Sequence, residues 1–243
     1  MAEAENPERV GSMLEHLDEL RRRLTRVVLA VGIGFVIALI FYEELWDLLR
    51  APYDQIYDKD LQSILPAEPF SVAMRIAGFG GLLLATPYLV SQVWGFVAPA
   101  LTKREKRWAV PIVAALTFLF ATGVVFAYNV LPRALDVLGG FLEVEYQPTI
   151  GQYTTFALRF MAVFGLTFQF PVFLFAAAAM GAISVEQLRK GRRWAVLVIV
   201  IVAAAATPTG DAFTLATLAV PLYLLYEVTI LIVRLVVRKP KPD

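Results

Sequence analysis

Apolar runs of about 20 residues recur along this chain, and they constrain its fold more than any other feature. A helix of about 20 residues crosses the roughly 30 Å of hydrocarbon in a bilayer and satisfies its backbone hydrogen bonds within itself. The runs do not alternate between apolar and polar residues as the strands of a membrane barrel do. Together with a hydrophobic content of 58%, they predict an all-α polytopic membrane protein.

We predict one integral membrane domain over residues 1–243 with six transmembrane helices. A cytoplasmic amphipathic helix over residues 12–23 precedes them and begins at a capping box of Ser12 and Glu15. The six spans cover about Leu24 to Tyr42, Phe70 to Val97, Trp108 to Leu131, Tyr153 to Ala182, Trp194 to Ala206 and Ala212 to Val233.

Lysine and arginine gather in alternate connections between these spans. Short loops rich in lysine and arginine stay in the cytoplasm, so both termini are predicted to be cytoplasmic, an N-in/C-in topology. The basic set comprises Arg21, Arg22, Arg23, Arg26, Lys103, Arg104, Lys106, Arg107, Arg189, Lys190, Arg192, Arg193, Arg234, Arg238, Lys239 and Lys241. The opposite connections are mainly acidic, with Glu43, Glu44, Asp47, Asp54, Asp58, Asp60, Glu68, Asp136, Glu143, Glu145 and Asp211.

The fifth span has only about 13 apolar residues, which as a helix reach about 20 Å and fall short of the hydrocarbon core. Either this hairpin is sunk within the protein, or the bilayer thins around it, or the helix extends a turn further. Four spans contain a proline that is expected to kink them: Pro87, Pro111, Pro171 and Pro221. Kinked helices and a short hairpin predict a bent, concave wall, the alternative being local kinks that serve no functional shape.

The first acidic connection is itself amphipathic. Its apolar residues follow a helical spacing, so we expect it to lie on the membrane surface or to cap the bundle. These residues are Leu45, Leu48, Leu49, Pro52, Tyr53 and Ile56.

Several kinds of chemistry are excluded by composition. The chain has no cysteine and one histidine, His16, so it offers no disulfide, thiolate nucleophile or histidine-rich metal site. No combination of serine, histidine and acid occurs within the spans, which argues against a membrane hydrolase. We therefore expect no enzyme activity and no cofactor.

Two isolated carboxylates lie in the basic connections. Glu19 can pair with Arg22 or Arg23 along its own helix, and Glu105 can relieve the repulsion among four neighbouring cations. A peptide ligand with guanidinium groups would use the same carboxylates, because arginine binds carboxylate in a bidentate fork that lysine cannot reproduce. Both interpretations stay open on the residues alone.

Four stretches resemble one family along nearly the whole chain. They are His16-Leu17-Asp18-Glu19-Leu20-Arg21, the loop from Gln92 to Leu101 leading into Glu105, the run Phe168-Gln169-Phe170-Pro171, and the segment from Thr207-Pro208 to Glu227. In this order they resemble TatC, the multispanning receptor component of the twin-arginine protein translocation system.

The resemblance implies a protein of the bacterial inner membrane that binds signal peptides with two adjacent arginines and exports folded proteins, driven by the proton-motive force. It assigns peptide binding to Glu19 and Glu105, with Arg21 and Arg23 shaping the site. It also implies the single-span partners TatA and TatB and self-association within the complex. Consecutive residues of an extended peptide project to opposite sides, so two carboxylates on facing surfaces suit a paired-arginine motif.

Three polar residues in or near the later spans are candidates for contacts with partner helices: Gln169, Thr207 and Glu227. An ionisable group within a span is costly unless it is paired or solvated, so Glu227 is either functional or bonded to a neighbouring helix. Many family members have glutamate at the position of Gln169, which keeps hydrogen bonding but carries no charge. The connection at Asp211 is also slightly longer than the usual form.

A small ion-coupled secondary transporter is the alternative function. Glu227, Gln169 and Arg159 would then form a polar pathway. The first three spans and the last three do not correspond in loop length or proline position, so the inverted repeat of many transporters is missing.

Overall fold

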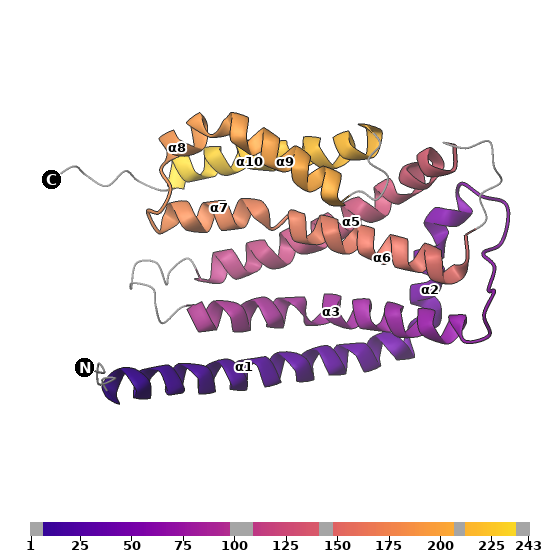
Figure 1. The fold of residues 1–243 in the computed structure, drawn as a ribbon, viewed down its shortest axis with the longest axis horizontal. Helices are drawn as coiled ribbons and strands as arrows, with labels where there is room; N and C mark the ends of the chain where they lie inside the picture. Colours follow the sequence, from indigo (N-terminus) through magenta and orange to yellow (C-terminus); the bar gives the residue numbers. More distant parts are fainter. Residues whose placement is uncertain (1–6, 98–108, 141–147, 207–211, 237–243) are drawn as a thin grey trace, which may run out of the picture.

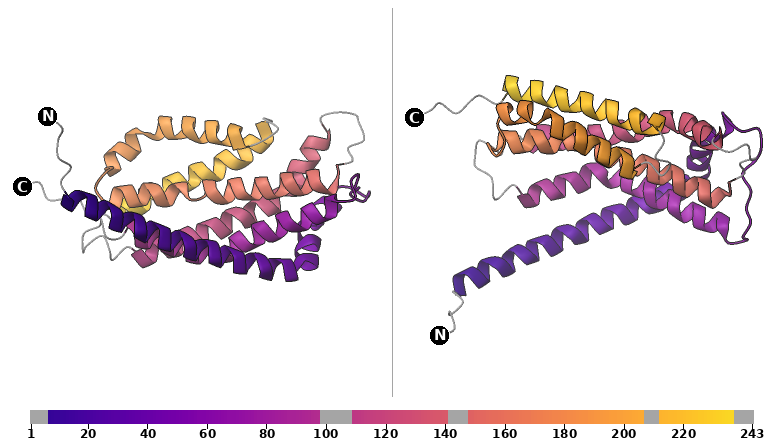
Figure 2. Two further views of the ribbon diagram at one scale, coloured as in Figure 1. Left: turned by 60° about the horizontal axis from the view of Figure 1, so that its bottom comes forward. Right: turned by 45° about the horizontal axis from the view of Figure 1, so that its top comes forward.

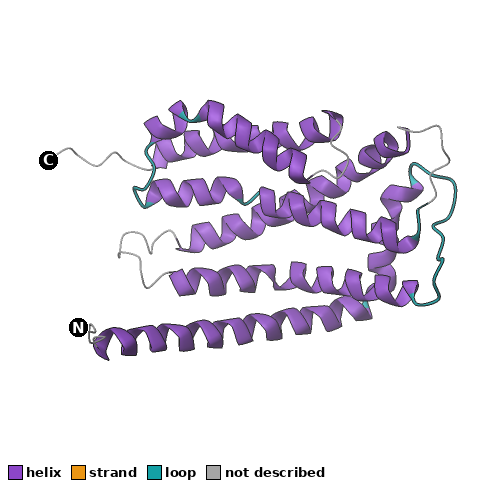
Figure 3. Cartoon of the chain, in the orientation of Figure 1, coloured by secondary structure: helices purple, strands orange, loops and turns teal. Residues whose placement is uncertain are grey.

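The structure, a computed structural model, describes residues 7–97, 109–140, 148–206 and 212–236. This part of the chain is helical apart from turns, loops and an isolated bridge between Gln62 and Thr149 (Figure 3). Its helices are α1 (Pro7–Ile40), α2 (Tyr42–Asp54), α3 (Glu68–Val97), α5 (Ala109–Gly140), α6 (Ile150–Thr167), α7 (Phe170–Ala179), α8 (Val185–Lys190), α9 (Arg192–Ala206) and α10 (Ala212–Val236).

The long helices run side by side, and α2 lies across one end of the bundle (Figure 1). We call this end the α2 end. The start of α1 and the end of α10 both lie at the opposite end, which we call the terminal end, although they are apart from each other (Figures 1 and 2). The first and last described helices thus have their outer ends on one side of the bundle, as an N-in/C-in topology requires.

Five helical segments among the described residues are long and apolar enough to cross a membrane. They are Leu17–Ile40, Glu68–Phe96, Val110–Val137, Ile150–Ala179 and Leu215–Leu235. The fifth predicted span corresponds to α9, whose 15 residues extend about 22 Å and are too few for this criterion. The all-α polytopic fold is confirmed, and α9 as a short fifth span stays a prediction.

The first span differs from the prediction. Residues 12–23 do not form a separate helix, because α1 runs without a break from Pro7 to Ile40. Ser12 therefore lies inside α1, and the predicted capping box is wrong. Proline is well suited to a first helical turn, and the residues around Arg23 are good helix formers that give the helix no reason to end there.

Glycines let α1 pack tightly against α3. A Cβ added to Gly34 would lie 2.7 Å from the carbonyl oxygen of Gly81, and a Cβ on Gly81 would lie 2.5 Å from the backbone nitrogen of Phe35. The backbones of the two helices meet here directly, so only glycine fits at both positions. This crossing sets how far α1 stands from the rest of the bundle.

The α2 helix caps the bundle, which confirms one of the two predicted placements. Leu49 and Tyr53 are buried against the core. The hydroxyl of Tyr153 donates to the carbonyl of Leu49, and that of Tyr128 donates to the carbonyl of Leu48 at 2.9 Å. These bonds fasten α2 to α5 and α6.

The predicted fourth span is broken in two ahead of Pro171. The α6 helix ends at Thr167, and α7 begins at Phe170 with the proline in its first turn. The proline has no N–H to donate to the carbonyl four residues back, which favours a break at this point. Pro87 and Pro221 instead lie inside continuous helices, and Pro111 lies in the first turn of α5, where its missing N–H costs nothing.

Candidate functional site

Glu19 faces α3 from the terminal end of α1 and is already paired. The Nη2 and Nε atoms of Arg23 donate to its Oε1 at 2.6 and 2.9 Å. This confirms the predicted ion pair one turn along the helix. Both bonds use Oε1, and no bond to Oε2 is found among the described residues, so one carboxylate oxygen is available to a ligand.

Arg23 also joins α1 to the end of α3. Its Nη1 donates to the carbonyl of Gln92 at 3.4 Å. A Cβ on Gly95 would lie 2.3 Å from the same nitrogen, so the guanidinium occupies the space that the glycine leaves open. Arg23 thereby holds Glu19 close to the end of α3, whose last residue is Val97, eight positions before Glu105 in the sequence.

Two of the predicted site residues are placed differently. Glu105 lies outside the described residues. Arg21 is two positions from Glu19 and therefore on another face of α1, where it lines a shallow hollow with Asp18 and Arg22. The structure thus brings Glu19 and Arg23 together and leaves Arg21 apart from them.

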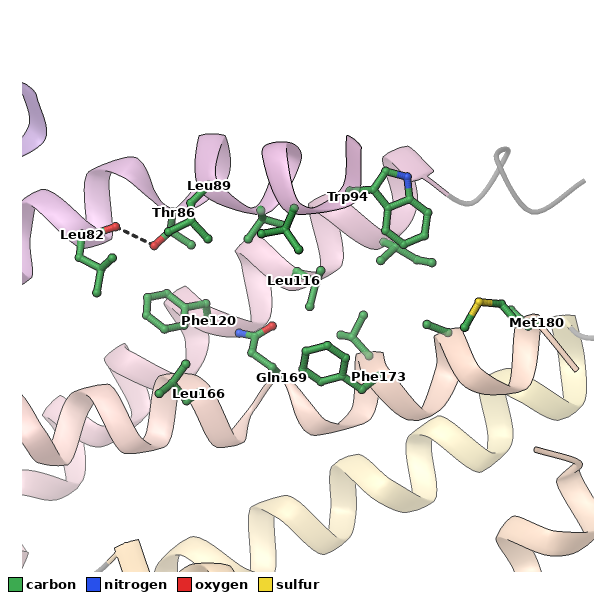
Figure 4. Close-up of a pocket in the computed structure, with 16 residues that line it drawn as sticks. Leu82, Thr86, Leu89, Trp94, Leu116, Phe120, Leu166, Gln169, Phe173 and Met180 are labelled. Carbon is green, nitrogen blue, oxygen red and sulfur yellow. Dashed lines mark hydrogen bonds between the residues drawn. The ribbon is translucent and has the colours of Figure 1, made fainter. Parts of the chain in front are cut away.

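A large apolar cavity opens between α3, α5 and the α6–α7 segment (Figure 4). Its volume is about 510 Å³. Leucine, valine, phenylalanine and alanine side chains form most of its wall, which gives the bundle the hollowed shape that the sequence predicts. The polar residues among its lining are Thr86, Trp94 and Gln169.

Gln169 is buried at the break between α6 and α7, with 8% of its surface exposed. Its backbone N–H bonds to Leu166, three residues back, which leaves the carbonyl of Gly165 without its usual helical donor. The side-chain Nε2 fills that role and donates to Gly165 at 3.1 Å. The Oε1 atom has no partner among the described residues and is an acceptor in the cavity wall.

Trp94 was not among the residues predicted from sequence. It lines the cavity towards the terminal end, and its indole N–H is buried without a partner among the described residues. The family-like stretch from Gln92 to Leu101 contains it, but its direction into the cavity depends on how α3 packs. This indole N–H and the Oε1 atom of Gln169 are both covered by the wall, so the surface that the cavity offers to an occupant is almost entirely apolar.

Glu227 is bonded to a neighbouring helix. Its Oε2 accepts from Nη2 of Arg192 at 2.7 Å, and its Oε1 accepts from the hydroxyl of Tyr223 at 3.0 Å. The preceding residue, Tyr226, donates its hydroxyl to the carbonyl of Leu188 at 2.7 Å. Glu227 and Tyr226 together fix the α8–α9 corner to α10.

The remaining candidates do not form one continuous site. Thr207 lies outside the described residues. The cavity wall that includes Gln169 contains neither Arg159 nor Glu227, so the polar pathway of a small transporter is not assembled in the described residues. No group of three histidine, cysteine or acidic residues suited to a metal ion occurs in this part of the chain.

The chain is similar in sequence to a known family of proteins. A family model described as "Sec-independent protein translocase protein (TatC)" matches residues 15–221. The chain is 37% identical over 234 residues to the Sec-independent protein translocase protein TatC of Desulforapulum autotrophicum, which covers 94% of this chain and 86% of that protein. It is 36% identical to the TatC of Carboxydothermus hydrogenoformans, with 95% of both chains covered.

A solved structure is also similar. The crystal structure of a twin-arginine translocase receptor, TatC, matches with a TM-score of 0.75 and 34% identity over 92% of this chain and 100% of that chain. A second structure of that receptor in the detergent DDM matches with a TM-score of 0.76 over 89% of this chain.

Proposed function

This chain belongs to the TatC family of Sec-independent protein translocase proteins, and on that premise we propose that it binds signal peptides with two adjacent arginines. With single-span partners of the TatA and TatB type, it then starts the export of folded proteins across the membrane. Its family and its apolar helices make it a polytopic membrane protein of protein transport.

The observation that carries this proposal is the arrangement around Glu19. The carboxylate has one oxygen engaged by Arg23 and one without a bond among the described residues. It lies beside the end of α3 at Val97, which Glu105 follows eight positions later in the sequence. A guanidinium from a peptide can bind the open oxygen without first displacing Arg23.

The second carboxylate in the proposal is Glu105. An extended peptide directs adjacent side chains to opposite sides, so one arginine would bind Glu19 and the other Glu105. Arginine can form two parallel hydrogen bonds with a carboxylate and lysine cannot, which would favour arginine over lysine at Glu105. At Glu19 the incoming guanidinium would bind the open Oε2 alone, since Oε1 is engaged by Arg23. Arg23 acts as a positioning residue for Glu19. Arg21 lies on another face of α1 and would act from that face.

The apolar cavity suits the apolar segment of the signal peptide or a partner helix. An apolar helix that entered this cavity would exchange its contacts with lipid for van der Waals packing against the cavity wall. Packing of this kind drives helix association in membranes. We propose Thr207 and Glu227 as further contacts for partner helices.

The proposed orientation puts the terminal end in the cytoplasm. Arg21 to Arg23, the α8–α9 corner and Arg234 are all at this end, and basic residues near spans are retained on the cytoplasmic side. Glu19 would then face the compartment in which signal peptides are made.

A peptide-binding experiment tests the proposal. A fluorescent signal peptide with Arg-Arg is titrated against the purified chain in nanodiscs and compared with its Lys-Lys counterpart. We expect Glu19→Ala and Glu105→Ala each to weaken binding by about tenfold or more, since each removes a charge-assisted bond. The Lys-Lys change should also weaken binding, because lysine keeps the charge but cannot form the two-bond fork. Glu43→Ala removes an exposed carboxylate at the α2 end and is the matched control. Equal affinity for both peptides, or equal effects of all three substitutions, would refute the proposed site.

A further inference from the structure

Arg23 leaves only one oxygen of Glu19 available to a ligand. The Nη2 and Nε atoms of Arg23 both donate to Oε1 of Glu19, at 2.6 and 2.9 Å. A carboxylate oxygen accepts about two hydrogen bonds, so Oε1 is fully used by Arg23. In the described part of the chain, Oε2 accepts no hydrogen bond, and 34% of the Glu19 side chain is exposed. An incoming cation therefore meets one open oxygen and not two.

Contacts with α3 keep Arg23 in this position. Its Nη1 atom donates to the carbonyl of Gln92 at 3.4 Å. The same atom occupies the space above Gly95, where the Cβ of a larger residue would collide with it. Arg23 would lose both contacts if it swung away from Glu19. We therefore expect Arg23 to stay on Oε1 when a peptide binds.

Arginine and lysine differ in what they need from a carboxylate. Arginine has its advantage when two of its N–H groups bond in parallel to the two oxygens of one carboxylate. The ammonium group of lysine is a compact charge and needs only one oxygen. With Oε1 of Glu19 occupied, the parallel arrangement is closed to an incoming arginine. Glu19 then recognises a positive charge and not the shape of a guanidinium group.

We propose that Arg23 is a specificity-determining residue: by occupying one oxygen of Glu19, it makes the peptide position that Glu19 binds tolerant of lysine. This inference rests on the proposed function, in which Glu19 binds one arginine of the pair, and it concerns that position alone. Removal of Arg23 opens both oxygens of Glu19. The position that Glu19 binds then becomes selective for arginine.

The preference for arginine over lysine at one peptide position separates this role from a purely structural one. Arg23 carries a positive charge and positions Glu19, so its removal changes the affinity for any cationic peptide. Arginine and lysine carry the same charge, so these effects largely cancel in the ratio of their affinities. A change in that ratio reports how many oxygens the carboxylate offers.

Binding of matched signal peptides to the full chain in nanodiscs tests the proposal. The fluorescent peptides carry Arg-Arg, Lys-Arg, Arg-Lys, Gln-Arg or Arg-Gln and are otherwise identical. Glu19→Ala identifies the position that Glu19 binds, because glutamine at that position should cost this variant no further affinity. Lysine at the same position should weaken binding to the parent protein by less than about threefold, since one charge-assisted bond is kept.

Substitutions of Arg23 test its part in this tolerance. Arg23→Ala should raise the preference for arginine over lysine at that position to about tenfold or more, the gain from one further charge-assisted bond. Arg22→Ala is the matched control, because it removes the same charge one position away and Arg22 bonds to the carbonyl of Asp18. Arg23→Lys can still engage Oε1, so its preference should stay close to that of the parent.

The results distinguish this proposal from the proposed function. An unchanged preference in Arg23→Ala, with Glu19→Ala still weakening Arg-Arg binding, would overturn the role of Arg23 and leave the proposed function standing. An equal rise in Arg22→Ala would do the same, because it would assign the effect to charge alone. If Glu19→Ala left Arg-Arg binding unchanged, both the proposed site and the role of Arg23 would be refuted.

Discussion

The direct contact of α1 with α3 predicts that a single methyl group on Gly81 will disturb peptide binding at a distance. In Gly81→Ala the new Cβ would lie 2.5 Å from the nitrogen of Phe35, about 1 Å closer than an ordinary contact. The obstacle is backbone, so no side-chain rotation relieves it. Overpacking of this kind costs about 1 to 3 kcal/mol, and moving α1 outwards relieves it.

The displacement grows along α1. If the helix pivots at Ile40, where it meets α2, Gly34 lies about 9 Å and Glu19 about 32 Å from the pivot. A shift of about 1 Å at Gly34 then becomes about 3.5 Å at Glu19 by simple leverage. That movement would separate Arg23 from Gln92 and draw Glu19 away from the end of α3.

The assay measures thermal unfolding and twin-arginine peptide affinity for matched variants. Gly81→Ala should lower both, and Gly34→Ala should behave similarly. Gly78→Ala on α3 and Gly32→Ala on α1 are controls, because a Cβ at either meets no atom within 4 Å. Alanine is favoured over glycine in a helix by about 1 kcal/mol, so the controls should be neutral or stabilised. Identical behaviour of Gly81→Ala and Gly78→Ala would refute the argument.

Three further predictions concern single side chains. Arg23→Gln should lower the free energy of unfolding by at most about 1 kcal/mol, as for an ion pair that is partly open to solvent. It should still weaken peptide binding several-fold, because Arg23 no longer holds the Glu19 carboxylate in place. An unchanged peptide affinity in a titration would contradict this. Gln169→Glu should be less stable than the parent by about 1 to 3 kcal/mol at neutral pH, because a carboxylate cannot donate to Gly165. Protonation of the carboxylate restores the donor, so this loss of stability should shrink as the pH falls. A loss of stability in thermal unfolding that does not change with pH would count against the bond. Glu227→Ala should impair assembly with partner helices or export more than it impairs peptide binding. A double-mutant cycle with Arg192→Ala should show a coupling free energy of about 1 kcal/mol or less. Unchanged assembly and export would make the residue dispensable.

Much of the fold could be predicted because the membrane makes local sequence decisive. A run of apolar residues in lipid has few alternatives to a helix, so the spans at α3, α9 and α10 agree with the predicted ranges within a few residues. The short α9 and the capping α2 followed from length and spacing alone. The start of α1 did not, because a possible cap at Ser12 does not end a helix that can continue in both directions.

The candidate site was predicted only as far as its residue types. An isolated carboxylate at Glu19 and its pairing with Arg23 follow from the spacing of one helix, and both are present. The link from Arg23 to Gln92 joins residues 69 positions apart, so it depends on how α1 lies against α3. The bond from Gln169 to Gly165 likewise requires the break in the helix to be known.

The sequence by itself therefore determined the membrane class, the helical spans, the sidedness of charge and the pairing of neighbours on one helix, because these depend on local periodicity and transfer into lipid. Only the tertiary structure decided that two glycines bring α1 against α3, that Trp94 and Gln169 line one cavity, and that Arg75 on α3 bonds to Gly151 and Thr155 on α6. The physical reason is that each of these contacts joins helices far apart in the chain, whose relative positions depend on packing over their whole length.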